Sequence, residues 1–188
     1  MQSSRFAHFL HKLRNVSILA SLIVLAFASL LDASALPREP GRVTKVVDGD
    51  TLVIQLDSGR SEHVRLIGID TPESKLNHRT SLQAKKTNSD EETIVALGHE
   101  AHQNTSRLAP VGTRVELEYD IQPRDKYKRI LAYVYLPDGA MLNEAIVSSG
   151  YASLLTIPPN VRYSERFQKA LIESRAAGRG LWSKAHPW

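Results

Sequence analysis

Two short acidic segments of the sequence stand where strand-like runs end. One is Asp48-Gly49-Asp50-Thr51, and the other is Asp70-Thr71-Pro72-Glu73, with Arg65 five residues before it. Carboxylate and carbonyl oxygens are the ligands that calcium prefers, and a guanidinium matches the geometry of a phosphate. The two segments therefore predict a site in which a hard cation and a phosphate meet.

The candidate ligands of the cation are Asp50 and Asp70, with the backbone carbonyl of Thr71 as a further oxygen donor. Glu73 lies close enough in sequence to orient or deprotonate a water molecule bound to the cation, and Asp48 is a candidate supporting residue behind the ligands. Calcium is favoured over zinc or copper because the sequence has no cysteine and neither segment has a histidine. Each aspartate taken alone is better explained as a turn residue, so the prediction depends on the segments meeting in the fold.

Basic residues supply the candidate phosphate contacts. Arg65 lies in a stretch rich in apolar residues, so its guanidinium needs an anionic partner, which is either a phosphate or a nearby carboxylate. Arg129 follows Lys126 and Tyr127, and basic residues around a tyrosine can hold a phosphate and stack a sugar or base. Without the acidic segments, the stretch 125–129 is interpreted as an exposed turn.

Apolar runs and alternations with β-branched residues predict five strands, at 42–47, 51–56, 62–69, 114–119 and 130–136. Helical spacing predicts helices at 91–108, 141–148 and 163–177. The segment 74–90 is polar and has no regular apolar period, so we predict a long loop there. Together these elements indicate a mainly β domain with helical additions, an α+β fold built on a five-stranded OB-fold barrel with about three helices.

Residues 1–35 differ in composition from the rest of the chain. Residues 1–15 have three basic side chains and no acidic one, residues 16–31 have no charge, and Ala33-Ser34-Ala35 is a small-residue pattern. This arrangement is typical of a secretory signal peptide, and the uncharged run is shorter than the ~20 residues that span a bilayer. We expect a cleaved leader and an exported protein, secreted or periplasmic. The alternative is an uncleaved membrane anchor formed by residues 16–31.

The remainder of the chain has the length of one domain. We expect a linker at 36–41, which has two prolines, a folded domain at 42–183 and a short tail at 184–188. Because there is no cysteine, packing, or packing with a bound ion, must stabilise an exported domain. The net charge is +4 for the whole chain, so the overall field alone does not indicate nucleic acid binding, and local clustering of basic residues must do so.

Three motifs, in order, resemble the staphylococcal nuclease (thermonuclease) family: V-V-D-G-D-T-L, V-R-L-I-G-I-D-T-P-E and D-K-Y-K-R-I-L-A-Y-V-Y. The later segments N-E-A-I-V-S-S-G-Y-A and G-R-G-L-W agree, so the resemblance covers roughly residues 42–183. It implies an OB-fold and a calcium-dependent phosphodiesterase of DNA and RNA that leaves 3′-phosphates. It also implies roles: Asp50, Asp70 and the Thr71 carbonyl as calcium ligands, Glu73 acting on the attacking water, Arg65 and Arg129 as phosphate clamps, and Lys126 and Tyr127 holding the terminal phosphate and sugar.

The sequence departs from this family pattern at two places. The stretch 155–159 has no tyrosine where the best-known member of the family has two that pack against the base, so the base-stacking residues are not identified. The segment after Glu73 is longer than in that member and contains four basic residues, Lys75, Arg79, Lys85 and Lys86. Two interpretations stay open for it: a segment that lies over the substrate strand, or a disordered loop.

We therefore predict a secreted, calcium-dependent nuclease that acts as a monomer on DNA, RNA or both. The alternative is a non-catalytic OB-fold module that binds nucleic acid, because OB-folds commonly bind single strands without cutting them. A binding module has no need of Asp50, Asp70 and Glu73 together with two arginines, and their joint presence favours the enzyme.

Overall fold

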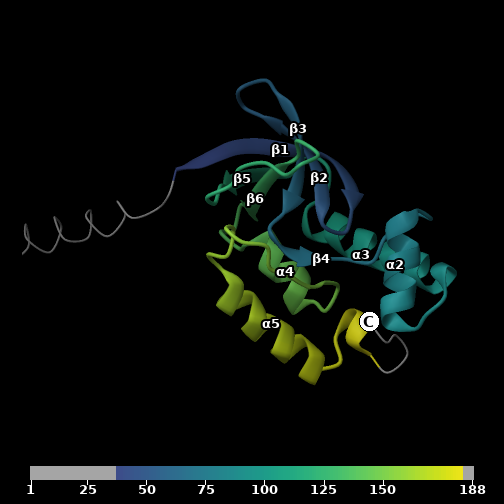
Figure 1. The fold of residues 1–188 in the computed structure, drawn as a ribbon. Coiled ribbons are helices and arrows are strands. Elements are labelled where there is room, and N and C mark those ends of the chain that lie inside the picture. The colour runs from purple at the N-terminus through teal and green to yellow at the C-terminus, as the bar shows by residue number, and fades with distance from the viewer. Residues whose placement is uncertain (1–36, 184–188) are drawn as a thin grey trace, which may run out of the picture. The chain divides into compact units, whose positions relative to one another are not determined.

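In the computed structural model, which describes residues 37–183, five strands close into a barrel in the order β1-β2-β3-β6-β5 (Figure 1). Neighbouring strands are antiparallel except β3 and β6, which are parallel. This confirms the predicted α+β fold with a five-stranded, OB-like barrel. The predicted leader at 1–35 and tail at 184–188 lie outside the described residues. The barrel strands are β1 (Arg38–Asp48), β2 (Thr51–Leu56), β3 (Ser61–Leu66), β5 (Arg114–Glu118) and β6 (Ile130–Tyr135).

Successive side chains of a barrel strand point to opposite faces, and the apolar ones point into the barrel. In β2, Leu52, Ile54 and Leu56 are at most 1% exposed. Complete burial of an aliphatic side chain of this size contributes about 1.5–3 kcal/mol to folding. Because the chain has no cysteine, this packing takes the place of covalent cross-links in stabilising the barrel.

The single strand predicted at 62–69 is divided in the structure. After β3, the chain leaves the barrel as β4 (Gly68–Asp70), which pairs with β7 (Ser153–Leu155) in a separate two-stranded sheet. Gly68 has a φ of 83°, and a Cβ at this position would lie 2.6 Å from the ring of Phe167. The glycine therefore allows a turn that other residues resist, and this turn separates the second acidic segment from the barrel wall.

The prediction of a loop at 74–90 is wrong over much of that segment, because residues His78–Thr87 form helix α2. The side chain of Asn77 caps this helix by accepting the backbone N–H groups of Arg79 and Thr80. A side-chain cap of this kind stabilises a helix by about 1 kcal/mol. The buried side chains of α2 are polar or small, so no apolar stripe marks the helix in the sequence: Thr80, Gln83 and Ala84.

Helices α3 (Glu91–Leu108), α4 (Leu142–Ser148) and α5 (Ser164–Ala176) confirm the three predicted helices, with ends within one residue of the prediction. A short 3₁₀ helix, η2, follows at Gly180–Trp182. Figure 1 shows α4 and α5 together on one side of the barrel, while α2 and α3 lie beside each other on another.

The prediction of a linker at 36–41 is wrong from Arg38 onward, because strand β1 begins there. Gly41, inside the supposed linker, pairs with β2 on one side and with β5 on the other. Pro40 misled the prediction, because proline is accepted at strand positions whose N–H has no ladder partner. The folded unit therefore begins at Arg38.

Candidate active site

The two acidic segments meet in the fold, as the prediction required. The carboxylate of Asp50 accepts the backbone N–H and the hydroxyl of Thr71, each at 3.1 Å, and the hydroxyl of Thr51 at 2.9 Å. Gly49 makes this contact possible, since a Cβ there would lie 2.8 Å from the Thr71 hydroxyl. The turn after β1 and the turn after β4 are therefore in direct contact.

Arg65 holds the two candidate metal ligands together. Its Nη2 lies 3.1 Å from Asp50 Oδ2 and 2.9 Å from Asp70 Oδ1. Its Nη1 donates to the backbone carbonyls of Leu66 and Ile69, and its side chain is only 7% exposed. Of the two partners that the sequence left open for Arg65, carboxylates occupy this guanidinium in the structure.

The carboxylates of this cluster also act on one another. Burial, followed by the charge of Asp50, raises the pKa of Asp48 to about 6, and Glu73 adds to the effect. Burial also raises the pKa of Asp70 against the opposing charge of Arg65. The crowding of negative charge is thus only partly compensated by protein groups, and a cation would relieve it.

The donor set fits a hard divalent ion in an open site. Within residues 37–183, no three carboxylate or imidazole side chains converge in metal-binding geometry. A cation here would therefore be held by Asp50 and Asp70, with the Thr71 carbonyl and water completing its shell, and calcium accepts this mixture. The Thr71 carbonyl accepts one hydrogen bond, from Gln83 Nε2 at 3.1 Å, and a carbonyl oxygen has two lone pairs.

Three residues of the segment that follows Glu73 bind its side chain and its backbone. Its Oε1 lies 2.9 Å from Arg79 Nε, and its Oε2 accepts the side-chain amide of Asn77 at 3.0 Å. Its backbone N–H donates to Gln83 Oε1 at 2.9 Å. Behind it, helix α3 approaches so closely that a Cβ on Gly98 would lie 2.3 Å from the Glu73 carbonyl oxygen.

Arg79 of helix α2 is a site residue that the sequence analysis did not identify. Besides Glu73, it contacts Asp70 Oδ1 at 3.0 Å, the same oxygen that Arg65 contacts. Burial lowers the pKa of Arg79, but the charges of Glu73, Asp70 and Asp50 raise it overall. The sequence showed only a basic residue in an inserted segment, and its placement depends on a helix that the sequence did not reveal.

The third motif forms a turn organised by Asp125. Its Oδ1 accepts the backbone N–H groups of Tyr127 and Arg129, and its Oδ2 lies 2.7 Å from Arg129 Nε. Lys128 adopts the left-handed region in this turn, with φ 68°. Asp125 therefore fixes the direction of the Arg129 guanidinium, a role that its position in the motif did not disclose.

Lys126 and Tyr127 lie at the exposed end of this turn. Tyr127 is 69% exposed. The Lys126 ammonium and the Arg129 guanidinium lie 5.1 and 5.5 Å from the centre of the Tyr127 ring, within the range of cation–π attraction. An exposed ring with two cations beside it is suited to a sugar or base that bears a phosphate.

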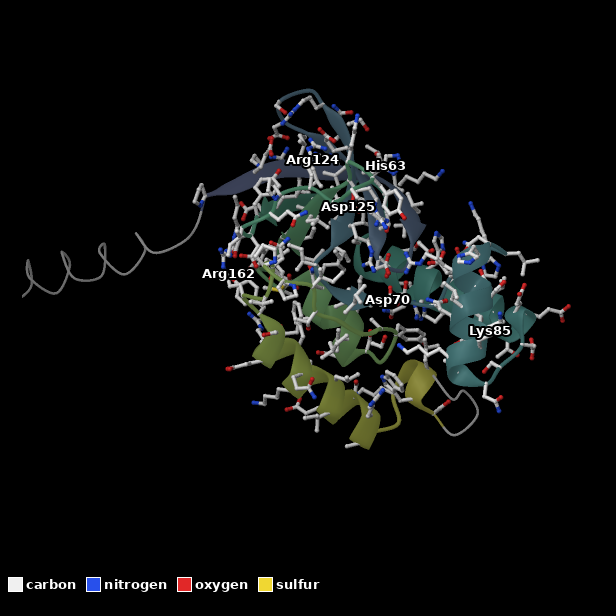
Figure 2. All side chains as sticks on the ribbon, in the orientation of Figure 1. His63, Asp70, Lys85, Arg124, Asp125 and Arg162 are labelled. Atoms are coloured by element: carbon white, nitrogen blue, oxygen red, sulfur yellow. The ribbon has the colours of Figure 1, made fainter. Side chains whose placement is uncertain are left out.

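A cavity of about 480 Å³ is lined by the arginines that contact the carboxylates and by the turn at 125–129, whereas Asp50, Asp70 and Glu73 are not among its lining residues. Its basic and aromatic lining residues are Arg65, Arg79, Lys126, Tyr127 and Arg129. Arg65 and Arg79 thus line the cavity and also contact the carboxylates. Figure 2 labels Asp70 at the end of β4 and Asp125 in the loop before β6. The volume is in the range of sites for small ligands.

The cavity also has an apolar wall formed by the stretch 155–159. Leu155, Ile157 and Pro158 line it, and Ile157 is 61% exposed. No tyrosine occurs in this stretch, so any base that lies here packs against aliphatic side chains.

The family model described as staphylococcal nuclease homologue matches residues 63–184. The chain belongs to the staphylococcal nuclease family. It is 31% identical over 176 residues to the thermonuclease of Staphylococcus hyicus, a match that covers 89% of this chain and 95% of the relative. It is 37% identical over 142 residues to the thermonuclease of Staphylococcus intermedius, covering 76% and 75%.

A third relative is the SPbeta prophage-derived endonuclease YokF of Bacillus subtilis (strain 168), 34% identical over 142 residues that cover 74% of this chain and 43% of the relative. Membership of the staphylococcal nuclease family, with thermonucleases and endonucleases as relatives, makes this chain a nuclease, a hydrolase that acts on nucleic acid. The alternative of a non-catalytic binding module is therefore not retained.

Proposed function

We propose that this nuclease is an exported, calcium-dependent enzyme that hydrolyses phosphodiester bonds of DNA, RNA or both and leaves 3′-phosphate products. The observation that supports this most strongly is the position of Arg65. It joins Asp50 to Asp70 within hydrogen-bond distance and lines the same cavity as Arg129. Carboxylates for a cation and guanidinium groups for a phosphate are thereby neighbours.

Each side chain has a task that fits its surroundings. Asp50, Asp70 and the Thr71 carbonyl would hold calcium, which when bound supplies a Lewis acid for the phosphoryl oxygen and the water. Glu73 takes a proton from the attacking water or aligns it. The water oxygen forms a bond to phosphorus as the bond to the 5′-oxygen breaks, the departing 5′-oxygen takes up a proton from solvent, and Arg129 faces the charge that develops.

The remaining residues hold or support the substrate and the site. Lys126 and Tyr127 bind the terminal phosphate and sugar at the exposed end of the cavity. Arg65 keeps the two aspartates together and contributes positive charge to the cavity. Asp48, at the start of the turn that contains Asp50, supports the site from behind the ligands.

Export fits this chemistry, because calcium sites of modest affinity fill where the ion is abundant, as outside cells. The supporting feature is the leader-like composition of residues 1–35. Within residues 37–183, no helix is long and apolar enough to cross a membrane. N-terminal sequencing of the exported protein distinguishes the two fates of the leader: a start near residue 36 supports cleavage, and an intact N-terminus supports anchorage through residues 16–31.

The proposed function is tested by digesting plasmid DNA and RNA with calcium, with magnesium and with neither, followed by end-group analysis of the products. We expect cleavage with calcium, products with 3′-phosphate ends, and loss of cleavage when a chelator is added. Undiminished cleavage in the presence of the chelator, or products with 3′-hydroxyl ends, would contradict the proposal.

A further inference from the structure

Helix α2 holds the one carboxylate to which the proposed function assigns the proton transfer. Each oxygen of the Glu73 carboxylate has a different partner from this segment, Arg79 for Oε1 and Asn77 for Oε2. The backbone N–H of Glu73 is bound by a third residue, Gln83. The same helix therefore fixes both the main chain and the side chain of Glu73.

The partners of Glu73 are themselves fixed. Asn77 uses its side-chain oxygen to cap α2 and its side-chain nitrogen to bind Glu73. Gln83 is 8% exposed, and it binds the Thr71 carbonyl with Nε2 and the Glu73 N–H with Oε1. This bidentate amide sets the spacing between a candidate metal ligand and the candidate base.

Arg79 forms ion pairs with two carboxylates of the site, Glu73 and Asp70. Its Nε contacts Glu73 and its Nη2 contacts Asp70, so its guanidinium bridges the candidate base and a candidate metal ligand. A glutamate side chain rotates about three bonds, and a misplacement of about 1 Å in an active site can lower the rate about 100-fold. Holding both oxygens restricts that rotation before substrate arrives.

We propose that α2 is a positioning element for the reaction, in which Arg79 and Asn77 hold the Glu73 carboxylate in the orientation that acts on water. This inference rests on the proposed function. Arg79 is a positioning residue that acts through Glu73. It lines the same cavity as Arg129, but Arg129 comes from the turn at 125–129 and pairs with Asp125, whereas Arg79 pairs with Glu73 and Asp70.

The test compares Arg79→Gln, Glu73→Gln and the double variant by steady-state cleavage of a defined oligonucleotide with calcium. We expect Arg79→Gln to lower kcat about 10- to 100-fold with KM unchanged, and Arg79→Lys to recover part of the loss. In the Glu73→Gln background, Arg79→Gln has no further effect, because its target is already removed. Lys85→Gln is the matched control, because Lys85 is an exposed lysine in the last turn of the same helix (Figure 2). We expect this variant to keep the wild-type rate.

A second variant separates positioning from folding. Asn77→Asp keeps an oxygen that can cap α2, because aspartate is as good a cap as asparagine, but it replaces the donor to Glu73 with a carboxylate. We expect the melting temperature to stay close to that of the wild type while kcat falls at least 10-fold.

Several outcomes would overturn the positioning role. Two of these are a wild-type kcat for Arg79→Gln and a fall in kcat by the same factor in the wild-type and Glu73→Gln backgrounds. The other two are a rise in KM without a fall in kcat and a rise only in the calcium concentration needed for the half-maximal rate. Failure of the proposed function looks different, because Glu73→Gln would then cleave at the wild-type rate, and the positioning role would fall with it.

Discussion

At the scale of single residues, Arg65 explains how two aspartates far apart in the sequence share a buried site. Its guanidinium is nearly inaccessible and pairs with both Asp50 and Asp70. Removing one partner of a buried ion pair leaves an uncompensated charge and costs about 3–5 kcal/mol. Substitutions at Arg65 therefore mix stability with catalysis, and a more exposed arginine gives a clearer test of phosphate binding.

Arg129 is that residue, because its side chain is 25% exposed and its only ion pair within residues 37–183 is with Asp125. We expect Arg129→Ala to lower kcat/KM about 100- to 1,000-fold, the usual effect of removing a donor from a developing oxyanion. The melting temperature should change little. Steady-state cleavage of an oligonucleotide and thermal unfolding measure the two quantities.

The control for this variant is Arg114→Ala, which removes an exposed arginine whose ion pair is with Asp57, outside the cavity. It should keep the wild-type rate. If Arg129→Ala were as active as Arg114→Ala, Arg129 would have no part in phosphate binding.

At the scale of elements, helix α3 supports both acidic turns from behind. The hydroxyl of Thr105 donates to the Gly49 carbonyl at 2.6 Å, which holds the turn between Asp48 and Asp50. Earlier in the same helix, Gly98 lies against the Glu73 main chain. The distance between the two acidic segments thus depends on one helix.

Gly98→Ala tests this dependence. A Cβ at position 98 would lie 2.3 Å from the Glu73 carbonyl oxygen and 2.6 Å from the Ser74 nitrogen, and backbone atoms cannot relieve such a clash by changing rotamer. Alanine stabilises a helix by about 1 kcal/mol relative to glycine. If the contact between Gly98 and Glu73 were unimportant, Gly98→Ala would therefore be more stable than the wild type.

We expect the opposite: a lower free energy of unfolding in denaturant titration, and a loss of about 10- to 100-fold in kcat because Glu73 is displaced. A more stable variant with wild-type activity would show that α3 can move away without cost.

The elements also show what a single sequence can predict. Strand β2 and helix α3 were predicted with their observed bounds because apolar periodicity marks them. The acidic turns were identified because several carboxylates occur together with an arginine at strand ends and match the motifs of the family. Helix α2 was missed because its buried face is polar. The roles of Asn77, Arg79 and Gln83 follow only from that helix, so these residues could not be assigned from sequence.

At the scale of the whole molecule, a domain without cysteine combines an apolar barrel with a crowded carboxylate cluster. The cluster opposes folding, because burial and like charges raise the pKa of both Asp48 and Asp70. A cation that binds the folded state and not the unfolded chain should offset this cost. Calcium is thus expected to affect stability as well as catalysis.

We expect calcium at about 100 times its Kd to stabilise the fold by about 2.7 kcal/mol, which raises the melting temperature by roughly 5–10 °C for a domain of this size. Thermal unfolding with calcium and with chelator measures the shift without reference to activity. The shift should be much smaller in Asp50→Asn. An unchanged melting temperature at millimolar calcium would contradict the proposed metal site.

The role of Glu73 in water activation is tested by comparing the calcium-saturated cleavage rate of Glu73→Gln with that of the wild type. Glutamine preserves the size of the side chain and can keep one of its two hydrogen bonds to the α2 segment, because its amide nitrogen cannot accept from Arg79 or Asn77. It cannot take a proton from water. General-base catalysis contributes about 100- to 10,000-fold, so we expect a loss of kcat in that range with KM unchanged. Equal rates for the two proteins would contradict this role of Glu73.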